Sequence, residues 1–234
     1  MHLSASLLDC GGCAAIRIWR DRARVAAQTA RNIAVTLIFA AEFSDRITVV
    51  TDTATTRPTS PCPTQIGALK ACVDCATRSA ITWAGSFDMS PCVHCPPPCS
   101  TPDPSVAWTS VRDKWLKKLN SHQNTHAPPG QSATVCVLGF DGSSAQATVL
   151  RDRGSAGSWF VDADSVALPI AIGYLESIGV NTGRSWVPIS MGWSDAAEFE
   201  RWAGVRIASA RNWLAQKKRC VVVSPPIAAH HIYK

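Results

Sequence analysis

The chain has 234 residues, of which 46% are hydrophobic and 17% charged, so it can bury one core and lacks the composition of a disordered protein. Its net charge of +6 is modest and does not by itself indicate a nucleic-acid-binding surface. The longest apolar run, residues 33–41 interrupted by Thr36, is too short to span a bilayer. We therefore expect one globular domain that binds neither nucleic acid nor membrane.

Residues 1–35 differ from the rest because they are rich in Arg and Ala and poor in acidic residues, with one amphipathic helical pattern over 14–31. Several interpretations stay open. The segment is a leader or propeptide, a secretory signal with Phe39-Ala40-Ala41 as its cleavage site, an upstream extension of a reading frame that starts at Val35, or an ordinary helix. We predict that the domain proper spans residues 36–234.

The first strong pattern after this segment is a β-hairpin. The runs TLIFAAEF and RITVVTD are rich in Thr, Val, Ile and Phe, and the polar dipeptide Ser44-Asp45 joins them. Thr36 opens the first run, and Asp52 closes the second. The sequence therefore predicts Thr36 and Asp52 at the same end of a strand pair.

The remaining elements alternate between β-rich and helical segments. A proline-rich loop separates the first strands from the first helix, because residues 90–104 hold too many prolines for regular structure. We expect strands at 79–84, 133–140, 145–151, 158–162, 169–172, 220–223 and 227–233, and helices at 106–119 and 196–217. This order, without βαβ alternation or internal repeats, favours a layered α+β domain.

Thr36, Asp52 and Lys70 together suggest a nucleophile. A threonine hydroxyl attacks a carbonyl well only when it is helped to lose its proton, which a buried lysine favours and an aspartate that orients the lysine supports. We expect Asp52 and Lys70 on neighbouring strands beside Thr36. Each residue also has an ordinary alternative role, as a strand threonine, a turn or capping aspartate and a surface lysine.

The ordered set of motifs resembles the proteasome β-subunit type of N-terminal-nucleophile (Ntn) hydrolase, including its simpler bacterial and phage-encoded versions. The interval from Thr36 to Asp52 and the later Lys70 match the family pattern. Three short segments also match: Trp83-Ala84-Gly85-Ser86, Leu138-Gly139-Phe140-Asp141 and Ala171-Ile172-Gly173.

The resemblance implies an αββα four-layer sandwich, with two antiparallel sheets between helical layers. It implies that Thr36 is the nucleophile, that Lys70 and Asp52 activate it, and that the N–H of Gly85 stabilises the oxyanion. It further implies a peptide or amide substrate, no cofactor and no metal, a homo-oligomer and a cytoplasmic location.

The sequence departs from the family pattern at three places. Val35 stands where the family has Gly or an initiator Met, and Tyr174 stands where a Ser follows the Ala-Ile-Gly segment. The aspartate expected before the last strands is absent from residues 217–220. Because the two missing groups normally support the nucleophile, a weakly active or catalytically dead structural subunit is an alternative.

The ten cysteines support a different class of protein. Cys72 with Cys75 and Cys92 with Cys95 form two C-x-x-C pairs whose spacing is typical of a structural zinc site in a non-enzymatic binding module. A disulfide framework is a further alternative. We expect no bound zinc, because Cys72 and Cys75 would lie in a turn before the strand at 79–84, and that strand would separate the two pairs.

Overall fold

The computed structural model describes residues 36–56, 64–65, 69–85, 102–121, 133–152, 158–217 and 223–234. All of them belong to one compact unit, residues 33–234. Within these ranges, no helix is long and apolar enough to cross a membrane.

Sheet 1 is built around the predicted hairpin. Strands β1 (Leu37–Glu42) and β2 (Arg46–Asp52) pair antiparallel, with Ile38 opposite Thr51 and Glu42 opposite Ile47. Later segments extend this pair on both sides, so that the strand order is β11-β10-β1-β2-β12. The added strands are β10 (Ile170–Gly173), β11 (Trp186–Pro188) and β12 (Ile227–Tyr233). The hairpin prediction is confirmed.

Sheet 2 is an antiparallel meander in which the strands pair in chain order, β5-β6-β7-β8-β9. Its strands are β5 (Ala71–Asp74), β6 (Ser79–Gly85), β7 (Ala133–Asp141), β8 (Ser144–Asp152) and β9 (Trp159–Ala163). A separate two-stranded ribbon joins β3 (Thr55–Thr56) to β4 (Thr64–Gln65).

Two α-helices are described, together with the short 3₁₀ helix η2 (Leu175–Ile178). Helix α2 spans Trp108–Ser121, and helix α3 spans Ala196–Gln216. Helix α3 begins where the Asp195 carboxylate accepts a hydrogen bond from the N–H of Glu198, while the Glu198 carboxylate accepts from Ser194. This reciprocal arrangement satisfies donors that the first helical turn leaves unpaired.

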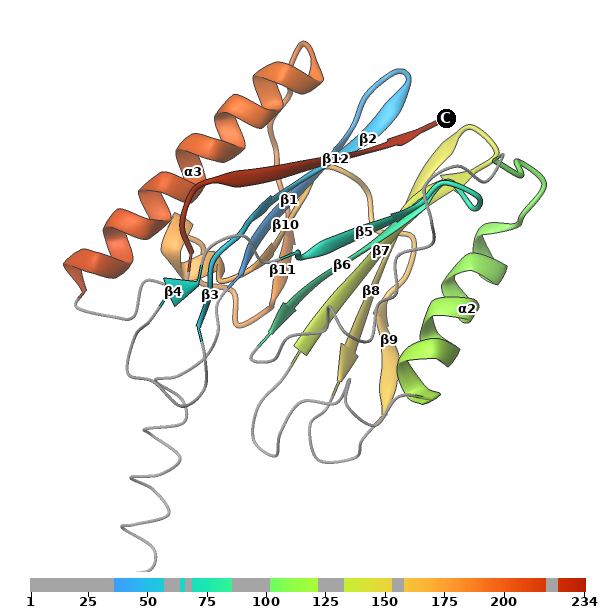
Figure 1. Cartoon of the computed structure of the whole chain (residues 1–234), viewed down its shortest axis with the longest axis horizontal. Coiled ribbons are helices and arrows are strands. Elements are labelled where there is room, and N and C mark those ends of the chain that lie inside the picture. The colour runs from blue at the N-terminus through green and yellow to red at the C-terminus, as the bar shows by residue number, and fades with distance from the viewer. Residues whose placement is uncertain are drawn as a thin grey trace, which may run out of the picture. The chain divides into compact units, whose positions relative to one another are not determined.

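In Figure 1, α2 lies beside sheet 2 and α3 beside sheet 1. Three groups of buried side chains hold these elements together. One lies between α2 and sheet 2, and includes Trp108 and Trp115 from the helix. A second, with Ile38 from sheet 1 and Leu138 from sheet 2, lies between the sheets. A third lies between sheet 1 and α3, and includes Phe39 and Phe199. The described chain is therefore an α+β domain with two antiparallel sheets and two α-helices.

Some predictions need correction. Cys72 lies within β5, opposite Ile81, rather than in a turn, and Cys75 alone begins the turn to β6. Strand β11 and helix η2 were not expected from the sequence. The helical pattern at 14–31, most of the proline-rich segment and residues 220–222 lie outside the described residues.

Candidate active site

Thr36 lies immediately before β1, at the end of sheet 1 where β2 and β10 also end. It is buried, with 6% of its surface exposed. Its carbonyl oxygen accepts a hydrogen bond of 3.0 Å from the N–H of Tyr174. Gly173, which pairs with Leu37, has a φ of +109°, and a Cβ atom there would lie 1.8 Å from the Thr36 carbonyl oxygen. Only glycine therefore fits beside Thr36 at this position.

Asp52 is the central group of the site. Its side chain is fully buried, and one carboxylate oxygen accepts a hydrogen bond of 2.9 Å from the N–H of Leu37, the residue after Thr36. The other oxygen accepts from the N–H of Ala54 at 3.1 Å and from Nζ of Lys70 at 2.8 Å. Asp52 thus connects the start of β1 to the lysine.

Lys70 reaches this carboxylate from the other sheet. It lies just before β5, its side chain is 4% exposed, and its carbonyl oxygen accepts from the hydroxyl of Thr82 and from the N–H of Trp83, both in β6. The expectation that Asp52 and Lys70 occupy neighbouring strands is therefore wrong. Asp52 ends β2 in sheet 1, whereas Lys70 immediately precedes β5 of sheet 2, so their ion pair connects the ends of the two sheets.

Burial controls the protonation of this pair. Burial lowers the pKa of the Lys70 ammonium and raises the pKa of the Asp52 carboxyl, because a low-dielectric interior disfavours both charges. The attraction between the two groups and their mutual hydrogen bond oppose both shifts. A buried lysine with a lowered pKa takes part in proton transfer more readily than an exposed one.

Gly85 is the last residue of β6 and pairs with Ala133 at the start of β7. It follows Trp83 by two residues, and Trp83 is hydrogen-bonded to Lys70. Gly85 therefore belongs to the same end of sheet 2 as Lys70. Its role as an oxyanion donor stays a prediction.

Sequence reasoning missed the contacts that Gly173, Tyr174 and Thr82 make with this site. The Ala-Ile-Gly segment matches the family pattern, but the sequence does not say which strand its glycine lies against. A glycine that ends a buried strand is a signal for close approach of another backbone, and it could have been used here.

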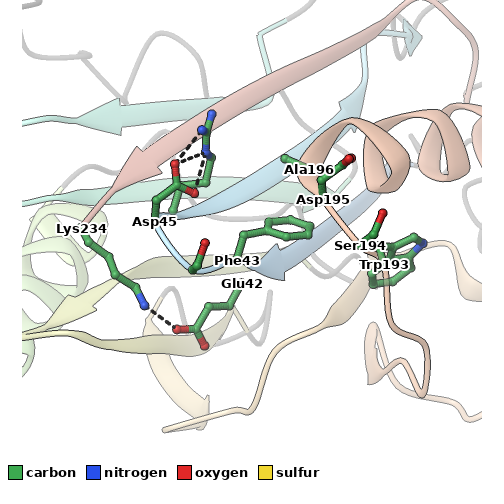
Figure 2. A pocket seen from close by; sticks show the side chains of 10 residues that line it. Glu42, Phe43, Asp45, Trp193, Ser194, Asp195, Ala196 and Lys234 are labelled. Carbon is green, nitrogen blue, oxygen red and sulfur yellow. Dashed lines mark hydrogen bonds and ion pairs between the residues drawn. The ribbon is translucent and has the colours of Figure 1, made fainter.

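A pocket of about 560 Å³ lies at the opposite end of β1 (Figure 2). In this pocket Lys234 forms an ion pair with Glu42, and Arg46 forms one with Asp45. Its lining residues are Glu42, Phe43, Ser44, Asp45, Arg46, Trp193, Ser194, Asp195, Ala196 and Lys234. None of them is among the predicted site residues.

The cysteines do not form the predicted alternative site within the described residues. Cys72 is disulfide-bonded, whereas Cys75 is an exposed free cysteine. Cys92 and Cys95 lie outside the described residues. In the part of the chain that the structure describes, no group of three or more His, Cys, Asp or Glu side chains is arranged to hold a metal ion.

No known protein-family profile matches the sequence, and no curated protein matches it. Among solved structures, Anbu (ancestral beta-subunit) from Yersinia bercovieri aligns with a TM-score of 0.50 at 9% identity, over 84% of this chain and 82% of that one. Anbu from Hyphomicrobium sp. strain MC1 aligns with a TM-score of 0.49 at 11% identity, over 85% and 87% of the two chains. Thiobacillus denitrificans BPH in complex with epoxomicin aligns with a TM-score of 0.46 at 11% identity, over 85% and 98%.

The first of these similarities shows that the chain shares the fold of Anbu, an ancestral beta-subunit. At this level of identity it shows the fold alone. The resemblance predicted from the motifs is confirmed to that extent.

Proposed function

We propose that this protein is a hydrolase of amide or peptide bonds that uses Thr36 as its nucleophile. The observation that supports the proposal is the buried contact of Asp52 with both Lys70 and the N–H of Leu37, immediately beside Thr36. A buried ion pair costs desolvation energy, so its position at the start of β1, one residue from Thr36, favours a functional role.

In the proposed reaction the Thr36 hydroxyl attacks the substrate carbonyl carbon and forms an ester. Its proton passes to the α-amine of Thr36 and then to the departing amine, after which water hydrolyses the ester. The Lys70 ammonium, oriented by Asp52, lowers the pKa of the hydroxyl. The N–H of Gly85 donates to the developing oxyanion. The α-amine serves as base only when nothing precedes Thr36, so we propose that the active chain begins there and that residues 1–35 are removed or not translated.

Several finer features of the proposal rest on the resemblance to proteasome β subunits. We propose that the layers form the αββα sandwich of Ntn hydrolases, that the protein self-associates, and that it is cytoplasmic. Fractionation of the native host tests the location, and recovery outside the cytoplasm would contradict it.

Site-directed variants test the function. Wild-type protein that begins at Thr36 is expected to hydrolyse members of a fluorogenic peptide panel, and Thr36→Ala to abolish turnover without loss of the fold. Lys70→Ala should lower the rate on the order of 10²-fold or more. Thr48→Ala is the matched control, because Thr48 is a buried strand threonine at the other end of β2. If wild type and all three variants behave alike, the catalytically dead structural subunit replaces this proposal.

The zinc-binding module is not supported as a second function. The disulfide at Cys72 leaves no thiolate there for a metal. Elemental analysis that finds one tightly bound zinc per chain would favour the zinc-binding module over the hydrolase.

A further inference from the structure

A polar cluster lies at the same end of the two sheets as Thr36, and we call it the Arg151–Ser185 cluster. In it, the Ser185 hydroxyl oxygen accepts hydrogen bonds from Thr134 Oγ1 at 2.6 Å and from Arg151 Nη2 at 3.2 Å. Arg151 Nη2 also lies 3.6 Å from Asp162 Oδ2, and the same oxygen accepts from Trp186 Nε1 at 3.3 Å. The members are Thr134, Arg151, Asp162, Ser185 and Trp186.

Side chains alternate between the two faces of a strand, and this alternation places the cluster on the face of sheet 2 that lies toward sheet 1. In β7, Ala133 and Val135 face α2, so Thr134 faces sheet 1. In β8, Leu150 faces α2 and Val149 faces sheet 1, so Arg151 also faces sheet 1. Neither residue contributes to the contact between sheet 2 and α2.

The strand pairing sets the distance from this cluster to Thr36. The N–H of Gly173 binds the carbonyl oxygen of Ser185, and Gly173 pairs with Leu37. Ser185 is therefore two strand spacings, about 10 Å, from the start of β1. It lies on the side opposite β2 and Asp52. An extended peptide covers such a distance in about three residues.

The donors of the cluster are incompletely used. Both acceptor positions of the Ser185 oxygen are taken by Thr134 and Arg151, so the Ser185 hydrogen must be donated elsewhere. Every polar contact recorded for Arg151 among the described residues uses Nη2, which leaves Nη1 and Nε available. The Arg151 side chain is 30% exposed, so these groups are accessible to a ligand.

Arg151 forms its described ion pair with Asp162, which holds the guanidinium in place, and the exposed Arg184 precedes Ser185 in sequence. The free N–H groups of Arg151 and the Ser185 hydroxyl hydrogen are donors that a carboxylate can accept through single, charge-assisted hydrogen bonds.

We propose that Arg151 and Ser185 bind a carboxylate of the peptide substrate about three residues from the bond that is cleaved. The proposal rests on the hydrolase function proposed above and gives it a substrate class, peptides with an acidic residue or a carboxyl terminus at that position. Asp162 acts as a positioning residue, because its carboxylate pairs with Arg151 Nη2 and accepts a hydrogen bond from Trp186.

The first test measures hydrolysis of paired fluorogenic octapeptides that carry Asp or Asn at each position in turn. The wild-type preference for Asp over Asn in kcat/KM is expected to reach about tenfold at one position, as for a charge-assisted hydrogen bond. Arg151→Gln and Ser185→Ala should reduce that ratio toward one, and Arg151→Lys should retain part of it. Arg46→Gln is the matched control, because the Arg46 side chain is 29% exposed and ion-paired but lies at the other end of sheet 1.

The second test separates this inference from the proposed hydrolase function. Fluorescence anisotropy measures binding of the same peptide pairs to Thr36→Ala, which is expected not to cleave them. The hydrolase function fails and the carboxylate site stands if three results are found together. Wild type cleaves none of the peptides, Thr36→Ala binds the Asp peptides more tightly than the Asn peptides, and the added substitution Arg151→Gln removes this difference in affinity. If Asp and Asn peptides are bound and cleaved alike, or if Arg46→Gln removes the preference as fully as Arg151→Gln, the inference is overturned.

Discussion

At the scale of single residues, the Asp52–Lys70 pair governs both stability and the proposed chemistry. Both side chains are almost completely removed from solvent, and Asp52 receives three hydrogen bonds. Removal of one partner leaves the other as an uncompensated buried group.

The first prediction concerns this pair. Asp52→Asn and Lys70→Met should each lower the free energy of unfolding by about 3–5 kcal/mol. The double variant should lose less than the sum, because no unpaired charge remains. Urea denaturation measures these changes, with Asp45→Asn as the control, since Asp45 belongs to an exposed pair and its loss should have little effect. Additive losses would show that the two groups do not interact.

The second prediction concerns Gly173. Gly173→Ala should displace the backbone of Thr36 and lower both Tm and hydrolysis, because the new methyl group would overlap the Thr36 carbonyl. Gly179→Ala is the control, since Gly179 also has a positive φ, +82°, but nothing lies within 4 Å of a Cβ there. The control should lose about 1 kcal/mol through backbone strain alone. Equal Tm values for the two variants would contradict the close contact.

The proximity of Thr36 and Asp52 could be predicted, because a hairpin with a short turn fixes which residues lie together at its open end. Lys70 could be proposed from its order in the chain, but its place in the other sheet could not. The contacts of Gly173 and Tyr174 with Thr36 depend on the pairing of β1 with a distant strand, and local sequence patterns carry no information about that pairing.

At the scale of elements, long patterned segments were predictable, whereas two short edge strands were not. Helices α2 and α3 and strands β7 and β8 have enough residues for a period to be visible. Strand β11 has three residues and β5 has four, and both are edge strands whose pairing depends on the neighbouring strand. Such strands are defined by tertiary contacts more than by propensity.

The third prediction concerns a contact that ties α2 to sheet 2. The Asp164 carboxylate accepts hydrogen bonds from the Thr148 hydroxyl in β8 and from Arg112 in α2. The hydrogen bond from Thr148, followed by that from Arg112, lowers the pKa of Asp164. A lowered folded-state pKa contributes stability above the unfolded value of about 3.9, and this contribution disappears as the pH falls through the folded-state pKa.

Denaturation measured between pH 3 and pH 7 should therefore give wild type a slightly larger free energy of unfolding than Asp164→Asn at neutral pH. This difference in the free energy of unfolding should become smaller below about pH 4. Because the Asp164 side chain is 38% exposed, solvent screening keeps the effect small. A difference that does not vary with pH would show that the ionised carboxylate is not responsible.

At the scale of the whole molecule, the two sheets meet through an apolar core whose polar end holds Thr36, Asp52 and Lys70. Composition indicated a single core. That the two sheets pack face to face is a tertiary property, which was predicted from the family resemblance and could not be predicted from sequence periodicity.

The fourth prediction is self-association, which the resemblance to proteasome β subunits implies. Size-exclusion chromatography with light scattering should give a mass that is a multiple of the chain mass. A mass that corresponds to one chain at every concentration tested would contradict it.

The central claim is that Thr36 is an N-terminal nucleophile, and mass-spectrometric mapping of a covalent adduct tests it most directly. Native protein is treated with an electrophilic peptide that needs both a hydroxyl and a free α-amine on the same residue. The account predicts one adduct per chain, on Thr36 as the first residue, and none on Thr36→Ala. A chain that retains residues 1–35 in full and carries no adduct at Thr36 would contradict it.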